Sequence, residues 1–170
     1  MSSREVSWAS PCRFCCTSFA NRRDVAVKAA VFENGQLVPE RDIEPELASE
    51  SIATLHFYGS LFFASAQYFE EQLPHPTEET RNAVVILNLR GQRDLDTTTL
   101  DMLTDYAQEL LEHDCRLMLA DVGEAARETL ERTGKLAVFG SDNVFAGSQH
   151  LQESVFKAYT EAERWLNTRP

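Results

Sequence analysis

The most informative part of this chain is the segment Ala83-Val-Val-Ile-Leu-Asn-Leu-Arg-Gly-Gln-Arg-Asp-Leu-Asp-Thr-Thr-Thr-Leu100. It begins with five apolar residues in a row, a pattern typical of a short strand that helices cover on both faces. After the polar turn, Leu or Ala recurs at three- and four-residue spacing, which predicts an amphipathic helix from about Thr97 to His113. The segment therefore predicts a central strand, a turn and a long helix, in this order.

Strand and helix patterns alternate through the rest of the chain. Further strands are expected at residues 51–58, 115–120 and 136–139, and further helices at residues 63–73, about 122–133 and about 148–167. Residues 25–38 predict a hairpin, because two short extended segments flank an Asn34-Gly35 turn. Right-handed strand–helix–strand units place helices against the faces of a parallel sheet. We therefore expect an α/β fold with a four- to five-stranded, mostly parallel sheet, about four helices and an N-terminal hairpin.

The chain has the length of one domain with a tail. At 170 residues with 43% hydrophobic side chains, it can build a single core. Residues 1–24 are basic and contain cysteine, and they are expected to be a tail or linker. Residues 25–50 are expected to hold the hairpin and a Pro-rich, acidic connector, and residues 51–167 the main domain.

Charge and hydropathy disfavour nucleic-acid binding and insertion into a membrane. Acidic residues outnumber basic ones by 27 to 16, for a formal charge of −11, so the general field repels nucleic acid. The longest uncharged run, residues 51–69, is interrupted by histidine, glycine, serine and glutamine, which disfavours insertion into a membrane. A cytoplasmic protein that binds no nucleic acid is expected.

The sequence offers no cofactor motif, metal site or catalytic group. Cys12, Cys15 and Cys16 are crowded in the tail, and Cys115 lies in an expected strand, whereas a closed zinc site needs four ligands. The role of the three tail cysteines stays open. The four histidines are scattered, and no glycine-rich phosphate loop or serine nucleophile elbow follows a strand. We expect a protein that is not an enzyme and carries no metal or cofactor.

The turn before the long helix has two interpretations. Asp96, Thr97 and Thr98 stand at the helix start, where short oxygen side chains cap free backbone N–H groups. A hydroxyl at the same place can also carry a phosphate beside the partial positive charge of the helix, which would change the local surface. Both interpretations remain open at this point.

These residues resemble the STAS domain family, whose members carry a strand, an Asp-Ser-Ser/Thr-Gly-Leu-like turn and a helix in this order. Here the turn reads Asp96-Thr97-Thr98-Thr99-Leu100, with Thr99 in the place of the family glycine. The segments Leu55-His-Phe-Tyr-Gly-Ser-Leu-Phe-Phe-Ala-Ser-Ala66 and Tyr68-Phe-Glu-Glu-Gln-Leu73 are similar to the opening strand and helix of the STAS domains of SulP (sulfate permease) transporters. The resemblance covers about residues 25–166.

The resemblance implies a regulatory, non-enzymatic interaction domain associated with a sulfate or other anion transporter. Its partner would be the membrane domain of such a transporter, in the same chain or another, at the inner face of the membrane. The resemblance also supports an alternative, a soluble anti-sigma-factor antagonist that binds a regulatory kinase and is phosphorylated at Thr97. The transported anion, the oligomeric state and the modification of Thr97 stay open.

Overall fold

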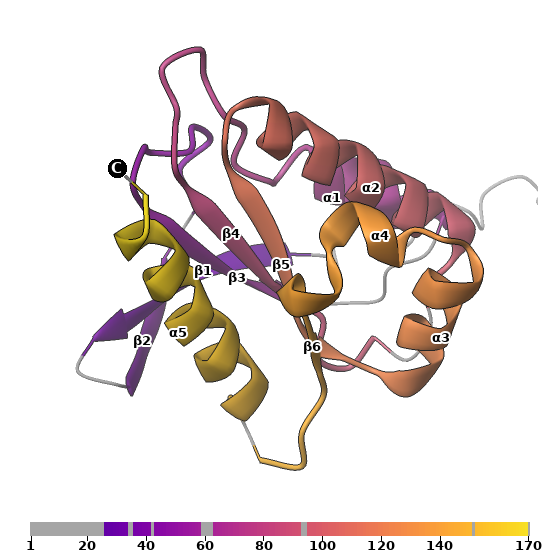
Figure 1. The fold of residues 1–170 in the computed structure, drawn as a ribbon. Coiled ribbons are helices and arrows are strands. Elements are labelled where there is room, and N and C mark those ends of the chain that lie inside the picture. The colour runs from indigo at the N-terminus through magenta and orange to yellow at the C-terminus, as the bar shows by residue number, and fades with distance from the viewer. Residues whose placement is uncertain are drawn as a thin grey trace, which may run out of the picture.

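The computed structural model describes residues 26–33, 36–41, 43–58, 63–92, 95–150 and 152–169. They form one sheet with helices on both of its faces (Figure 1). The strands are β1 (Ala26–Glu33), β2 (Gln36–Arg41), β3 (Ile52–Tyr58), β4 (Val84–Asn88), β5 (Arg116–Val122) and β6 (Val144–Ala146). The helices are α1 (Phe63–Glu70), α2 (Thr97–Glu112), α3 (Glu124–Arg132), α4 (Leu136–Phe139), the 3-10 turn η1 (Ser141–Asn143) and α5 (Glu153–Asn167).

The six strands lie in the order β2-β1-β3-β4-β5-β6. Strands β3 to β6 are parallel, as the predicted strand–helix alternation requires. The hairpin β1–β2 continues the same sheet, because β1 pairs antiparallel with β3 and places Lys28 opposite His56. The mostly parallel α/β sheet with an N-terminal hairpin is thus confirmed, although the Asn34-Gly35 turn itself lies outside the described residues.

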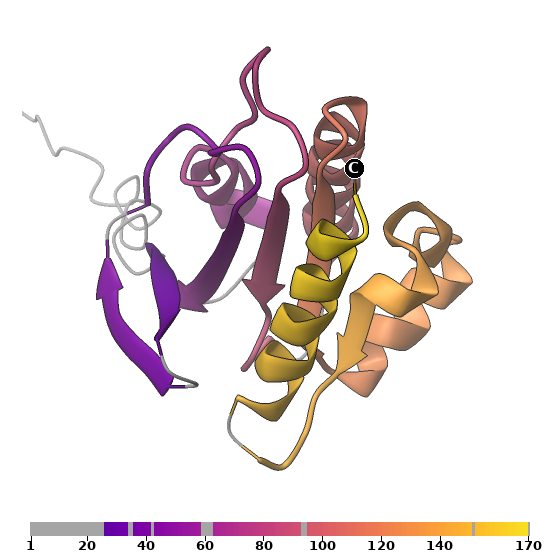
Figure 2. The same cartoon turned by 60° about the vertical axis from the view of Figure 1, so that its left-hand side comes forward.

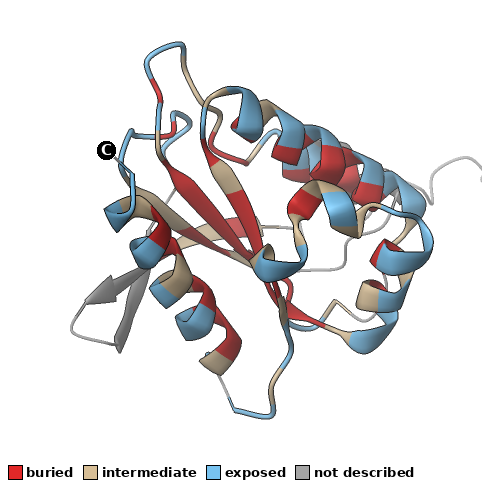
Figure 3. Cartoon of the chain, viewed as in Figure 1, coloured by how far each residue is buried: buried red, intermediate tan, exposed pale blue. Residues whose placement is uncertain are grey.

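Strand β4 is the centre of the sheet and is buried along its whole length (Figure 3). Val84 and Ile86 pack on one side in a cluster with residues of α5, whereas Val85 and Leu87 pack on the other side in a cluster with residues of α2. Both faces of the strand are therefore apolar. This arrangement explains why the sequence shows a continuous apolar run here and no alternation.

The helices form two unequal layers. Figures 1 and 2 show α5 across one face of the sheet and α1 and α2 on the other. Residues of α5 that face the sheet are Val155, Ala158, Ala162 and Trp165, all buried. On the other face α2 buries Leu100, Leu103 and Leu110 in the larger cluster and leaves its polar side in solvent. The amphipathic helix predicted from residue 97 onward is therefore confirmed.

One expected strand is wrong. Leu136-Ala-Val-Phe139 forms the short helix α4, and Val144–Ala146 forms the edge strand β6. A run of four apolar residues carries no periodicity that separates a strand from a helical turn. Here Gly140, at φ +80°, ends the helical turn. The helical conformation places the side chain of Phe139 in the larger hydrophobic cluster.

Candidate functional site

The polar turn lies at the carboxyl end of β4, where parallel sheets commonly place their functional loops. The Leu89 N–H donates to the carbonyl oxygen of Ala120 at 2.9 Å, so the chain stays attached to β5 for one residue beyond β4. The Asn88 side-chain oxygen then accepts from the N–H of Arg90 at 2.9 Å, and Gly91 takes φ +87°. These contacts turn the chain away from the sheet toward the start of α2.

Asp96 caps the start of α2. Its backbone is extended, and its Oδ1 accepts from the Thr99 N–H at 2.7 Å, while its carbonyl oxygen accepts from the Leu100 N–H at 3.0 Å. Asp96 thereby satisfies a backbone donor that has no partner within the helix. Asp96 is thus the N-cap residue of α2.

The other four residues of the predicted turn divide into two pairs. Thr97 and Thr98 are exposed, whereas Thr99 and Leu100 are fully buried. Thr99 therefore directs its side chain into the protein and not toward the surface that Thr97 and Thr98 present. Its hydroxyl is buried and has no hydrogen-bond partner in the described part of the chain.

A buried carboxylate stands behind the turn and was missed by sequence reasoning. Asp121, near the end of β5, is 3% exposed at its side chain, and its Oδ2 lies 3.7 Å from the guanidinium of Arg90. The N–H of Ser148 lies 3.5 Å from Oδ1, and the backbone φ of Asp121 is +54°. In the sequence, Asp121 is visible only as an aspartate directly after the apolar run Leu117–Ala120. The pairing of β4 with β5 brings it beside Arg90.

The outer face of α2 continues the exposed turn as an acidic stripe. Its acidic residues recur every three or four positions and are Asp101, Asp105, Glu109 and Glu112. The ammonium of Lys135 lies 2.6 Å from Asp101, and the ring of His75 lies 3.0 Å from Glu109. The helix contains no basic residue, so the stripe keeps a negative field over the turn.

The family model of the STAS domain matches residues 47–155, which includes β3, the turn, α2 and the start of α5. That match covers more than half of the chain. The chain belongs to the STAS domain family. No curated protein is similar enough to count as a match.

Solved structures support the STAS fold. A sulfate transporter family protein from Wolinella succinogenes is 23% identical with a TM-score of 0.57, and the match covers 72% of this chain and 93% of that one. The murine Slc26a9 anion transporter in its inward-facing state is 14% identical with a TM-score of 0.59 over 84% of this chain. A second SLC26A9 structure is 14% identical with a TM-score of 0.60, also over 84% of this chain. This STAS domain spans only 22% and 24% of those two transporter chains.

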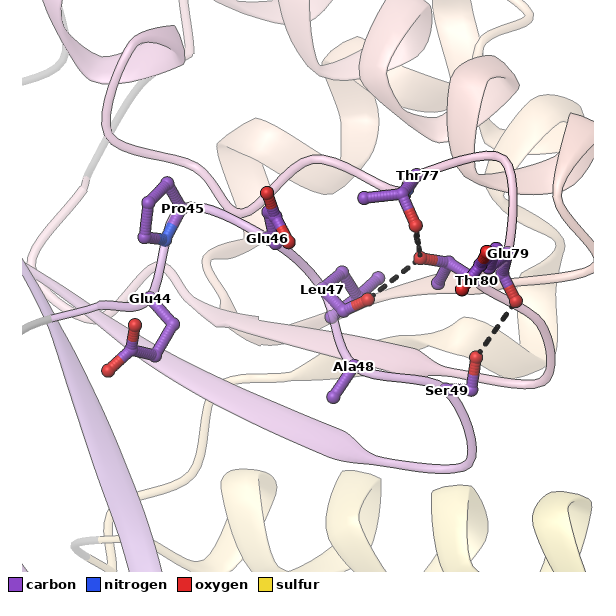
Figure 4. Close-up of a pocket in the computed structure, with 9 residues that line it drawn as sticks. All are labelled: Glu44, Pro45, Glu46, Leu47, Ala48, Ser49, Thr77, Glu79 and Thr80. Carbon is purple, nitrogen blue, oxygen red and sulfur yellow. Dashed lines mark hydrogen bonds between the residues drawn. The ribbon is translucent and has the colours of Figure 1, made fainter.

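Figure 4 shows a hollow of about 570 Å³ that residues 44–49 line together with Thr77, Glu79 and Thr80. It is bordered by the segments that precede β3 and β4, and Thr80 holds them together by donating to the carbonyl oxygen of Leu47 at 2.8 Å. Glu44, Glu46 and Glu79 line it without a basic residue. Its charge disfavours an anionic ligand.

Metal-binding groups and membrane-spanning helices are absent from the part of the chain that the structure describes. Among the described residues, no three of the His, Cys, Asp and Glu side chains lie together as a group that could hold a metal ion. None of the described helices is both long and apolar enough to cross a membrane. Cys12, Cys15 and Cys16 lie outside these residues, and Cys115 is buried, which raises the pKa of its thiol.

Proposed function

We propose that this STAS domain is a non-enzymatic regulatory and interaction domain of a SulP-type sulfate or other anion transporter, attached to it in one chain or bound to it as a separate chain. The observation that carries the proposal is the match of residues 47–155 to the STAS family. The likeness of the fold to a sulfate transporter family protein over 93% of that protein supports the same direction. The domain then acts in the cytoplasm, at the inner face of the membrane, and needs no cofactor.

The surface proposed for the interaction is the face made by residues 90–103 and the outer side of α2. Thr97 and Thr98 are exposed there, and Asp96 fixes the helix end that presents them. The acidic stripe gives this face a charge that a basic segment of the transporter would complement. The start of α2 is held in place within this face, because the buried side chain of Leu100 anchors it to the core.

A site-specific crosslink tests this surface. A photoreactive amino acid placed at Thr98 or Asp105 in the full-length protein should crosslink to a membrane-embedded anion transporter, or to its membrane domain. The same amino acid at Phe156, which is exposed on α5 on the other face of the sheet, serves as the control and should not form such a crosslink. Deletion of the domain should also reduce sulfate or bicarbonate uptake. Crosslinks that contain no transporter, together with unchanged uptake, would contradict the proposal.

A soluble anti-sigma-factor antagonist remains the second candidate, because Thr97 is exposed at the first position of α2. In that case a regulatory kinase binds the turn and phosphorylates Thr97, and the phosphate disrupts binding of the partner. Mass spectrometry after incubation with a co-encoded kinase should find the phosphate on Thr97, and Thr97→Ala should abolish it. Thr98→Ala is the matched control, since Thr98 is also exposed and follows Thr97 in the sequence. Failure of any such kinase to bind the domain would remove this candidate.

A further inference from the structure

Two arginines stack on one buried tryptophan near the amino end of β5. The guanidinium carbon of Arg116 lies 4.7 Å from the ring centroid of Trp165, and that of Arg169 lies 4.5 Å from it. Arg116 is the first residue of β5, whereas the other two residues come from the end of α5 and the residues after it. The folded sheet thus brings two positive charges from distant parts of the sequence onto one ring.

Neither guanidinium has a carboxylate within salt-bridge distance in the described part of the chain. Other arginines do: Arg127 pairs with Glu131 at 3.1 Å, and Arg164 pairs with Glu161 at 2.5 Å. Burial and the nearby charge of Arg169 lower the pKa of Arg116, and the charge of Glu161, which is ion-paired with Arg164, opposes them in part. In a chain with 27 acidic residues, two arginines that share one ring and make no ion pair within the described residues are an unusual concentration of positive charge.

The tryptophan that both arginines contact is held by packing. Trp165 is 8% exposed and belongs to the cluster between α5 and the sheet. The Thr168 hydroxyl donates to the carbonyl oxygen of Trp165 at 2.8 Å, and the Arg169 N–H donates to that of Leu166 at 3.2 Å. The partial negative charge at the carboxyl end of α5 favours a basic side chain nearby, which accounts for the position of Arg169. It does not account for Arg116, which lies on a strand.

We propose that Arg116 and Arg169 bind a tetrahedral oxyanion, the phosphate or sulfate group of a small soluble molecule. The planar guanidinium donates two parallel hydrogen bonds to such a group, and stacking on Trp165 holds its plane in advance. An anion bound at either guanidinium would also offset the repulsion between the two positive charges. The overall charge of −11 disfavours an extended anionic surface such as a lipid bilayer, so a small ion fits this site better. The site is remote from the turn, and the inference does not depend on a transporter.

Fluorescence of Trp165 tests the site in the full chain. Trp8→Phe leaves Trp165 as the one tryptophan. Sodium phosphate or sodium sulfate, measured against sodium chloride at equal ionic strength, should change its emission with a saturating curve. Arg116→Gln or Arg169→Gln should weaken binding about tenfold or more, because each removes charged hydrogen bonds to the anion. Arg127→Gln is the control and should leave the dissociation constant unchanged.

The outcomes separate binding from a purely structural role. Arg116→Lys keeps the charge but loses the planar fork, so an intermediate affinity is expected. Arg169→Gln is a second variant at an exposed position, should Arg116→Gln fail to fold, and circular dichroism checks both. No saturation by phosphate or sulfate, or equal affinity in both glutamine variants and the parent, would overturn the inference. A response only to vesicles containing phosphatidylglycerol, and not to phosphatidylcholine or the free ions, would equally overturn it.

Discussion

Thr99 stands where the STAS turn usually has glycine, and its buried hydroxyl has no hydrogen-bond partner among the described residues. Thr99→Val keeps the shape of the side chain and replaces that hydroxyl by a methyl group. Leaving a buried donor unsatisfied costs about 1–3 kcal/mol, so we expect Thr99→Val to raise the free energy of unfolding by about 1 kcal/mol. Thr and Val have similar helix propensities, so the backbone contributes little to the difference.

Thr104 provides the matched control in the same helix. It is 8% exposed, and its hydroxyl donates to the carbonyl oxygen of Leu100 at 2.6 Å. Thr104→Val removes a hydrogen bond that is made, so it should lower the free energy of unfolding by about 0.5–1.5 kcal/mol. The two identical chemical changes are thus expected to have opposite signs.

Urea unfolding followed by circular dichroism measures both variants. The midpoint should rise for Thr99→Val and fall for Thr104→Val, with the slope against urea unchanged. In thermal unfolding, about 1 kcal/mol corresponds to roughly 2–4 °C for a chain of this size. Destabilisation of Thr99→Val equal to that of Thr104→Val would refute the reasoning, because it would mean that the Thr99 hydroxyl is satisfied.

Three further predictions concern α2. Asp96→Ala should destabilise the protein by about 1 kcal/mol through loss of the cap to Thr99, whereas Asp96→Asn should retain most of the stability, as urea midpoints will reveal. Leu103→Ala should cost about 2–5 kcal/mol because the side chain is fully buried, and Leu111→Ala, at a residue 51% exposed, should change the unfolding free energy little. Burial raises the pKa of Tyr106, so the folded protein binds this proton more tightly than the unfolded chain, and stability should fall as pH rises above about 10. Tyr106→Phe should reduce that loss in unfolding curves measured between pH 9 and 11.

The sequence predicted the elements whose pattern is set by burial alone. β4 is covered on both faces and α2 on one, so a continuous apolar run and a helical period follow directly from their places in the fold. β6 has three residues and pairs at the edge of the sheet, too short for any period to develop. The Leu136–Phe139 run has the composition of a strand but forms a helical turn, because packing of Phe139 and Gly140 at positive φ decide its conformation.

Site residues divide in the same way. The cap at Asp96 was predictable because a helix start is a local feature, read from neighbouring residues. Asp121 beside Arg90, and Arg116 over the ring of Trp165, are contacts between residues 31 and 49 positions apart in the sequence. Those pairs depend on strand order and on the packing of α5, which no local pattern reports.

The division of the turn into buried and exposed threonines links the fold to the proposed function. Because Asp96 caps the helix and Leu100 is fully buried, the backbone between them is held before any partner arrives. A partner that contacts Thr97 and Thr98 therefore meets a surface that is already ordered, which reduces the entropy lost on binding. It follows that substitutions of the exposed threonines should alter binding with little change in stability, whereas substitutions of Asp96 or Leu100 should alter both. A partner whose affinity responds equally to all four positions would have to recognise the whole helix end and not the exposed hydroxyls.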